Sequence, residues 1–192
     1  QYTISSDETI LLFVAAGDWK RKGLPLIIDA LSYLKKQVRF FVVGKDEISP
    51  YLAMAEENGV QDKIIFAGPC SDVKRFYAAS DIFVFPSYFE AFSMVTLEAA
   101  AAGLPIIATK VNGIEELIQD GYNGFFVKHD SRDIANKIEI LFKNQQLLKT
   151  MGENARKSAM RFRRQDVTKR TEEAFKKVIA MSKQNTVQER NY

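Results

Sequence analysis

Short apolar runs alternate with longer amphipathic stretches along nearly the whole chain. Each apolar run has the length of a buried strand, and each amphipathic stretch carries apolar residues at helical spacing. Six strands are predicted: Ile10–Ala16, Val38–Gly44, Lys63–Gly68, Asp81–Ser87, Leu104–Thr109 and Gly124–Lys128. Helices are predicted between consecutive strands and in three stretches after the last one. This alternation indicates a parallel sheet covered on both faces, an α/β fold of the doubly wound, Rossmann-like kind.

The predicted fold also indicates how the chain is organised. A length of 192 residues suits one α/β domain, expected here over residues 1–182. The last helix is predicted from Asp166 to about Met181, and residues 183–192 are polar and expected to fray. The first ten residues have no basic n-region and no apolar h-region, so no secretory signal is predicted. The chain begins on Gln1, as expected of a fragment of a longer protein.

The amino-acid composition limits the classes of protein to which the chain can belong. Hydrophobic residues make up 46% and charged residues 27% of the chain, as in globular proteins with a buried core. A formal net charge of +3 does not indicate a nucleic-acid partner. The single cysteine cannot form an internal disulfide, which favours a reducing compartment. Apolar runs stay short of the roughly 20 residues that a transmembrane helix needs.

Known phosphate-binding and catalytic patterns are mostly missing. Neither a G-x-G-x-x-G nor a G-x-x-x-x-G-K-[ST] sequence occurs, and no D-x-D suggests a metal-bridged diphosphate. His129 is followed by an aspartate and a serine, but neighbours in sequence do not make a catalytic triad. We therefore expect His129 to be a solvated loop residue, and we expect no metal site.

Two loops at the carboxyl ends of strands carry the candidate chemistry, because ligands of doubly wound folds bind at that edge. The first contains Lys20, Arg21 and Lys22 directly before a helix N-terminus, a setting that favours phosphate. From this loop alone, it is equally plausible that the three side chains are simply exposed to solvent and bind no ligand. The second contains Glu90 and, eight residues later, Glu98 in an apolar, Ala-rich helix. A carboxylate in such a run needs hydrogen-bond partners or a ligand.

The second loop, E-A-F-S-M-V-T-L-E-A, resembles the E-x7-E signature of retaining family 4 glycosyltransferases, also called glycosyl transferases group 1. Further similarities follow in order from about Thr9 to Phe175, including R-K-G, V-V-G, I-I-F-A-G and A-A-S-D-I-F-V-F-P-S. The resemblance implies the C-terminal half of a GT-B fold. Within the family, the first loop is most similar to lipopolysaccharide core glucosyltransferases.

The resemblance implies roles for individual residues. Arg21 and Lys22 would bind the donor diphosphate, Glu90 would contact the donor sugar, and Glu98 would accept hydrogen bonds from the ribose. Other donor-binding positions are implied along the same edge: Gly44, Gly68, Pro69, Phe92, Ser93, Met94 and Val95. The chain departs from the family pattern at Ala15–Ala16, Ala91 and Asn112–Gly113, where glycine or Gly-Arg is usual. We expect Ala91 to narrow the pocket near the sugar.

The function that follows is donor binding by one half of a transferase. The substrate would be a nucleoside diphosphate sugar, by preference a UDP-sugar, with no other cofactor. A missing N-terminal domain would bind a glycolipid or polysaccharide acceptor, and the parent protein would be cytoplasmic, at the inner face of the membrane. Two alternatives remain open: a nucleotide-sugar epimerase domain, and a non-catalytic nucleotide-sugar-binding module.

Overall fold

A computed structural model describes residues 8–189 of the 192-residue chain. The first seven residues, which include most of the start inspected for a secretory signal, lie outside the described residues, as do residues 190–192 of the predicted tail. The chain divides into two units, residues 1–159 and residues 160–192.

The first unit is built on a six-stranded parallel sheet in the order β3-β2-β1-β4-β5-β6. Its strands are β1 (Thr9–Ala15), β2 (Val38–Gly44), β3 (Ile64–Gly68), β4 (Ile82–Phe85), β5 (Ile106–Thr109) and β6 (Gly124–Val127). The strand order reverses between β1 and β4, and this is the point at which open α/β sheets bind ligands. The predicted parallel, doubly wound sheet is confirmed.

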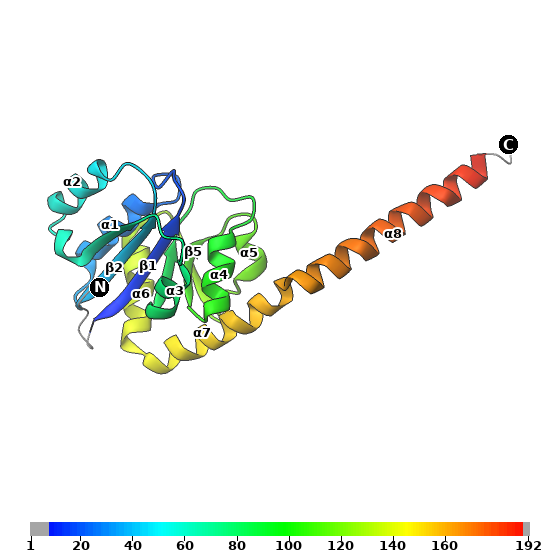
Figure 1. Cartoon of the computed structure of the whole chain (residues 1–192). Helices are drawn as coiled ribbons and strands as arrows, with labels where there is room; N and C mark the ends of the chain where they lie inside the picture. The colour runs from blue at the N-terminus through cyan, green and yellow to red at the C-terminus, as the bar shows by residue number, and fades with distance from the viewer. Residues whose placement is uncertain (1–7, 190–192) are drawn as a thin grey trace. The chain divides into compact units, whose positions relative to one another are not determined.

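Helices cover both faces of the sheet (Figure 1). They are α1 (Leu24–Tyr33), α2 (Ser49–Glu57), α3 (Lys74–Ala79), α4 (Met94–Ala102), α5 (Ile114–Leu117), α6 (Ser131–Lys143) and α7 (Gln145–Ala159), with a 3-10 turn at Gln61–Lys63. Helix α1 packs against α2 and α6, and helix α4 packs against α3 and α7. Right-handed crossovers place α1 and α2 on one face and α4 on the other.

Apart from β3, whose residues are all half-buried, the strands are buried almost throughout. This burial is why their sequences are continuous apolar runs rather than alternating ones. Every residue of β4 and β5 is buried, and so are the last five residues of β1. Pro86 follows β4 directly and lacks the N–H that another ladder bond would need. The strand therefore ends at the edge where the chain turns into the loop containing Glu90.

Gly44, the last residue of β2, lies against the neighbouring strand. Its φ is +133°, and a Cβ there would lie 1.8 Å from the carbonyl oxygen of Ala15. We expect Gly44→Ala to lower the free energy of unfolding by about 2–4 kcal/mol. The alanine would be destabilised both by the positive φ and by the steric clash of its Cβ with Ala15. Gly59→Ala is the matched control, because Gly59 has φ +65° with nothing within 4 Å. Urea unfolding measures both; equal losses would contradict a steric role for Gly44.

The second unit contains a 3-10 turn (Met160–Phe162) and the helix α8 (Arg164–Glu189). The predicted domain over residues 1–182 spans both units and stays a prediction. Residues 183–189, expected to fray, continue α8. This segment contains no glycine or proline, so its polar composition alone does not end a helix. None of the helices within residues 8–189 is both long and apolar enough to cross a bilayer.

Candidate donor-binding site

A pocket of about 410 Å³ lies at the carboxyl ends of β1 and β4. Its walls come from the loop after β1, the loop after β4 and the first turn of α4. The lining residues are Val14, Ala15, Ala16, Gly17, Asp18, Arg21, Lys22, Phe85, Glu90, Ser93, Met94 and Val95. The volume is within the range of small-molecule sites. The pocket lies at the predicted edge of the sheet, where the strand order reverses between β1 and β4.

Lys22 and Glu90 form an ion pair across this pocket. The Lys22 Nζ lies 2.5 Å from Glu90 Oε1, and the two side chains are only 17% and 8% exposed. The lysine ammonium also lies 5.7 Å from the centre of the Phe85 ring. The charge of Glu90, predicted from its apolar surroundings to need a partner, is therefore balanced by Lys22.

Arg21 is held by two acceptors on different loops. Its Nε donates to a carboxylate oxygen of Asp18, and its Nη1 donates to the carbonyl oxygen of Phe89 at 2.8 Å. The guanidinium holds the pKa of the Asp18 carboxyl below its usual value, chiefly through this hydrogen bond. A guanidinium has five N–H donors, so Arg21 retains donors that can bind an oxyanion.

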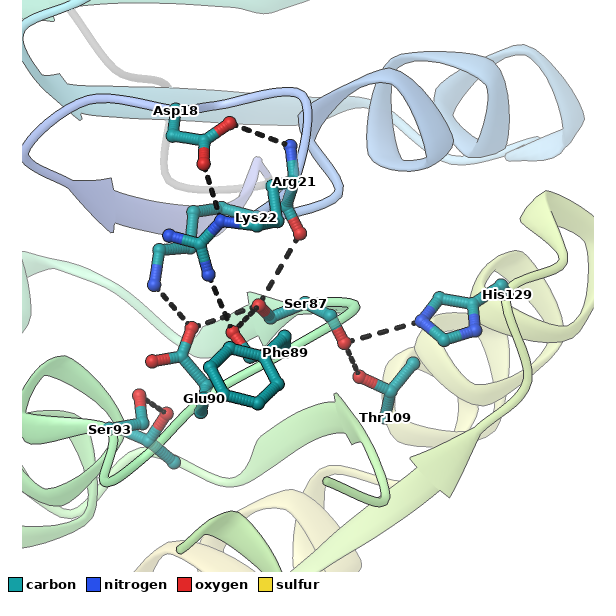
Figure 2. A network of polar contacts seen from close by, with 10 residues as sticks. Asp18, Arg21, Lys22, Ser87, Phe89, Glu90, Ser93, Thr109 and His129 are labelled. Carbon is teal, nitrogen blue, oxygen red and sulfur yellow. Dashed lines mark hydrogen bonds and ion pairs between the residues drawn. The ribbon is translucent and has the colours of Figure 1, made fainter. Parts of the chain in front are cut away.

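Ser87, in the loop after β4, contacts the loop after β1, the end of β5 and the loop after β6 (Figure 2). It is fully buried, and its hydroxyl donates to Glu90 Oε1 at 2.8 Å. Its carbonyl oxygen accepts a hydrogen bond from the Thr109 hydroxyl and lies 3.2 Å from His129 Nε2. The backbone that orients Glu90 is therefore fixed from β4, β5 and the loop after β6.

His129 is exposed, as predicted, but it is not isolated. Its ring stacks on that of Tyr88, with centroids 4.0 Å apart and planes 3° from parallel. Together with the contact to the Ser87 carbonyl, this stack places His129 beside the site as a support for the loop after β4. His129 does not line the pocket.

The N-terminus of α4 forms the remaining wall. Ser93 is 5% exposed, and its hydroxyl lies 2.6 Å from that of Thr96. The first amides of an α-helix have no acceptor within the helix and present a partial positive charge. With Met94 and Val95 also at the pocket, this helix end adds attraction for an anion to that of Arg21 and Lys22.

The structure thus brings together Arg21, Lys22, Glu90, Ser93, Met94 and Val95, while the other predicted residues lie elsewhere. Phe92 is 39% exposed and does not line the pocket. Ala91 is exposed and is also outside the lining, so the narrowing expected near the sugar stays a prediction. Gly68 is the last residue of β3 and Pro69 follows it, and both lie outside the lining. Gly44 does not line the pocket either, and a side chain there would clash with the carbonyl oxygen of Ala15.

Glu98 lines a second pocket, of about 630 Å³, between α3 and α4. It lies one helical turn beyond Met94, so the two side chains share a face of α4 that runs from one pocket to the other. Glu98 is exposed, and its Oε2 accepts a hydrogen bond of 2.9 Å from the Tyr77 hydroxyl. The two glutamates of the E-x7-E sequence therefore occupy different surroundings, one buried and paired with a cation, the other open.

Several residues at this edge were missed by the sequence analysis. Asp18 differs from the other described non-glycine residues in having a positive φ, of 53°. Ser87 and Thr109 could have been noticed, because each is a polar residue at the carboxyl end of an apolar strand. Tyr77 has no comparable signal, since its partner Glu98 is on another helix.

No metal centre emerges from the geometry of residues 8–189. Within that range, no three His, Cys, Asp or Glu side chains are arranged to hold a metal ion. The absence of a metal requirement therefore stays a prediction.

The six-stranded parallel sheet with helices on both faces is the Rossmann-like fold found in GT-B glycosyltransferases. The family model for glycosyl transferases group 1 matches residues 1–158, and the chain belongs to that family. The family and fold predicted from the sequence are confirmed.

The chain is similar to several characterised proteins. It is 38% identical over 125 residues to the lipopolysaccharide glucosyltransferase WaaG of Escherichia coli K12, covering 63% of this chain and 33% of WaaG. It is 30% identical over 192 residues to the N-acetyl-alpha-D-glucosaminyl L-malate synthase of Bacillus anthracis, covering 97% and 50% of the two chains. Among solved structures, Anabaena HepE in complex with UDP-glucose has a TM-score of 0.80 at 26% identity, covering 91% and 50%. The chain spans half or less of each of these proteins.

Proposed function

We propose that this chain is the donor-binding domain of a retaining glycosyltransferase. The donor is a nucleoside diphosphate hexose, preferably a UDP-sugar, and the acceptor is a glycolipid or polysaccharide of the lipopolysaccharide-core kind, bound by a separate N-terminal domain. The chain needs no cofactor besides this substrate. The protein acts in the cytoplasm, at the inner face of the membrane.

The observation that carries the proposal is the pairing of Lys22 with Glu90 beside Arg21 in one pocket. Glycosyl transfer needs a stabilised diphosphate leaving group and support for positive charge that develops on the sugar. The two cations and the N-terminus of α4 supply the first, and the Glu90 carboxylate supplies the second. The UDP-glucose complex of the similar HepE supports uridine as the base.

The roles of the two glutamates give a direct test. Glu98→Gln is expected to weaken binding of free UDP, because its proposed partner is the ribose. Glu90→Gln is expected to spare free UDP and to weaken binding of a UDP-hexose, because its proposed partner is the sugar. We expect losses of about three- to thirtyfold, because glutamine keeps a carbonyl acceptor and each variant removes only the negative charge that strengthens the hydrogen bond.

Calorimetric titration of each variant with UDP and with UDP-glucose measures both effects. Glu57→Gln is the matched control, because Glu57 is exposed at the end of α2 and lines neither pocket. Equal losses for both ligands in both variants would show that the roles are wrongly divided.

A further inference from the structure

Tyr77 is a buried tyrosine whose hydroxyl is directed at the open pocket between α3 and α4. Only 4% of the residue is exposed, and its ring lies 6.1 Å from that of Phe83 in the core. Its hydroxyl donates to Glu98 Oε2 at 2.9 Å and lies 3.3 Å from the Val95 carbonyl oxygen. A rigid aromatic side chain in the core is thus joined to a flexible carboxylate at the surface.

The chemistry of the pair fixes which group donates. Burial, followed by the nearby Glu98 carboxylate, raises the pKa of the Tyr77 phenol, so it remains a protonated donor at neutral pH. Glu98 is exposed, and an exposed glutamate has many rotamers that binding must restrict. A hydrogen bond from the anchored phenol restricts them in advance, and it leaves Oε1 able to accept from a ligand.

We infer that Tyr77 is a positioning residue for ribose recognition: its hydroxyl holds Glu98 in the orientation that accepts hydrogen bonds from the ribose diol. This inference rests on the proposed function, in which Glu98 binds the ribose of the donor nucleotide. Tyr77 itself does not contact the sugar or the diphosphate. Because Tyr77 restricts the rotamers of Glu98 in advance, Glu98 loses less conformational entropy when the nucleotide binds.

Tyr77→Phe tests the inference, because it keeps the buried ring and removes only the donor. We expect its affinity for UDP to fall about two- to tenfold, the effect of ordering one flexible side chain on binding. Its affinity for 2′,3′-dideoxy-UDP, which offers no diol to Glu98, is expected to stay unchanged. The preference for UDP over the dideoxy analogue therefore shrinks. Tyr33→Phe, on α1, is the matched control, since Tyr33 is 47% exposed and lines neither of these two pockets.

Combining the variants separates this inference from the proposed function. We expect Tyr77→Phe/Glu98→Gln to bind UDP no more weakly than Glu98→Gln alone, because the hydroxyl acts only through the carboxylate. Equal losses for UDP and dideoxy-UDP in Tyr77→Phe, or strictly additive losses in the double variant, would overturn the positioning role. If Glu98→Gln itself leaves UDP affinity unchanged, the proposed ribose contact fails, and the role of Tyr77 with it.

Discussion

Lys22→Ala is expected to weaken binding of a nucleoside diphosphate by about ten- to a hundredfold. The variant removes a charge-assisted hydrogen bond worth roughly 1.5–3 kcal/mol. Arg21→Ala is expected to have an effect of similar size, because Arg21 keeps donors beyond those that contact Asp18 and Phe89. UMP is expected to lose less affinity than UDP if the loop contacts mainly the distal phosphate. Calorimetry with UDP and UMP measures each loss.

The control is Lys20→Ala, which removes an exposed charge from the same loop but lies outside the pocket lining. Lys22→Ala also leaves Glu90 without its cation, so urea unfolding is needed to show that the variant remains folded under the titration conditions. Unchanged UDP affinity in both Arg21→Ala and Lys22→Ala would exclude a phosphate-binding role for the loop.

The chain is expected to bind donor but to transfer no sugar to an acceptor. Transfer requires the reactive carbon of the sugar to meet an acceptor oxygen held in the correct geometry. In the proposed function, the pocket supplies charge for the diphosphate and the sugar, and the acceptor is bound by a separate N-terminal domain. Slow hydrolysis of the donor fits the proposal, because water can replace the acceptor.

A product assay with the 192-residue chain, UDP-glucose and heptose or lipid acceptors tests this expectation. The control adds no acceptor and measures donor hydrolysis alone. Saturable transfer at about 1 per second or faster, a rate typical of enzymes, would show that the acceptor site lies within this chain.

Most of the strands could be predicted because they are buried on both faces and are therefore continuous apolar runs. Ile82–Phe85 and Ile106–Thr109 are examples, and both agree with the predicted strands to within three residues at either end. Their alternation with helices then determined the parallel sheet. The end of α8 could not be predicted in this way, because a polar helix and a frayed tail have similar compositions.

The site was predictable as an edge of the sheet but not as a set of contacts. Residues that follow a parallel strand gather at one edge, which places Lys22 near Glu90 although they are 68 residues apart. The pairing of Arg21 with Asp18 depends on the left-handed backbone of Asp18, which no pattern in the sequence indicates. The hydrogen bond from Tyr77 to Glu98 depends on how α3 packs against α4, and packing between helices is not encoded in local spacing.

Calorimetric titration of the unaltered chain with UDP-, ADP- and GDP-glucose, and with free glucose, tests the donor-binding role most directly. We predict saturable binding of UDP-glucose, weaker binding of the other two nucleotide sugars, no measurable binding of free glucose, and a large loss of UDP-glucose affinity in Lys22→Ala. Absence of binding by all three nucleotide sugars would contradict a donor site and favour a non-catalytic scaffold in which Lys22 and Glu90 only stabilise the fold.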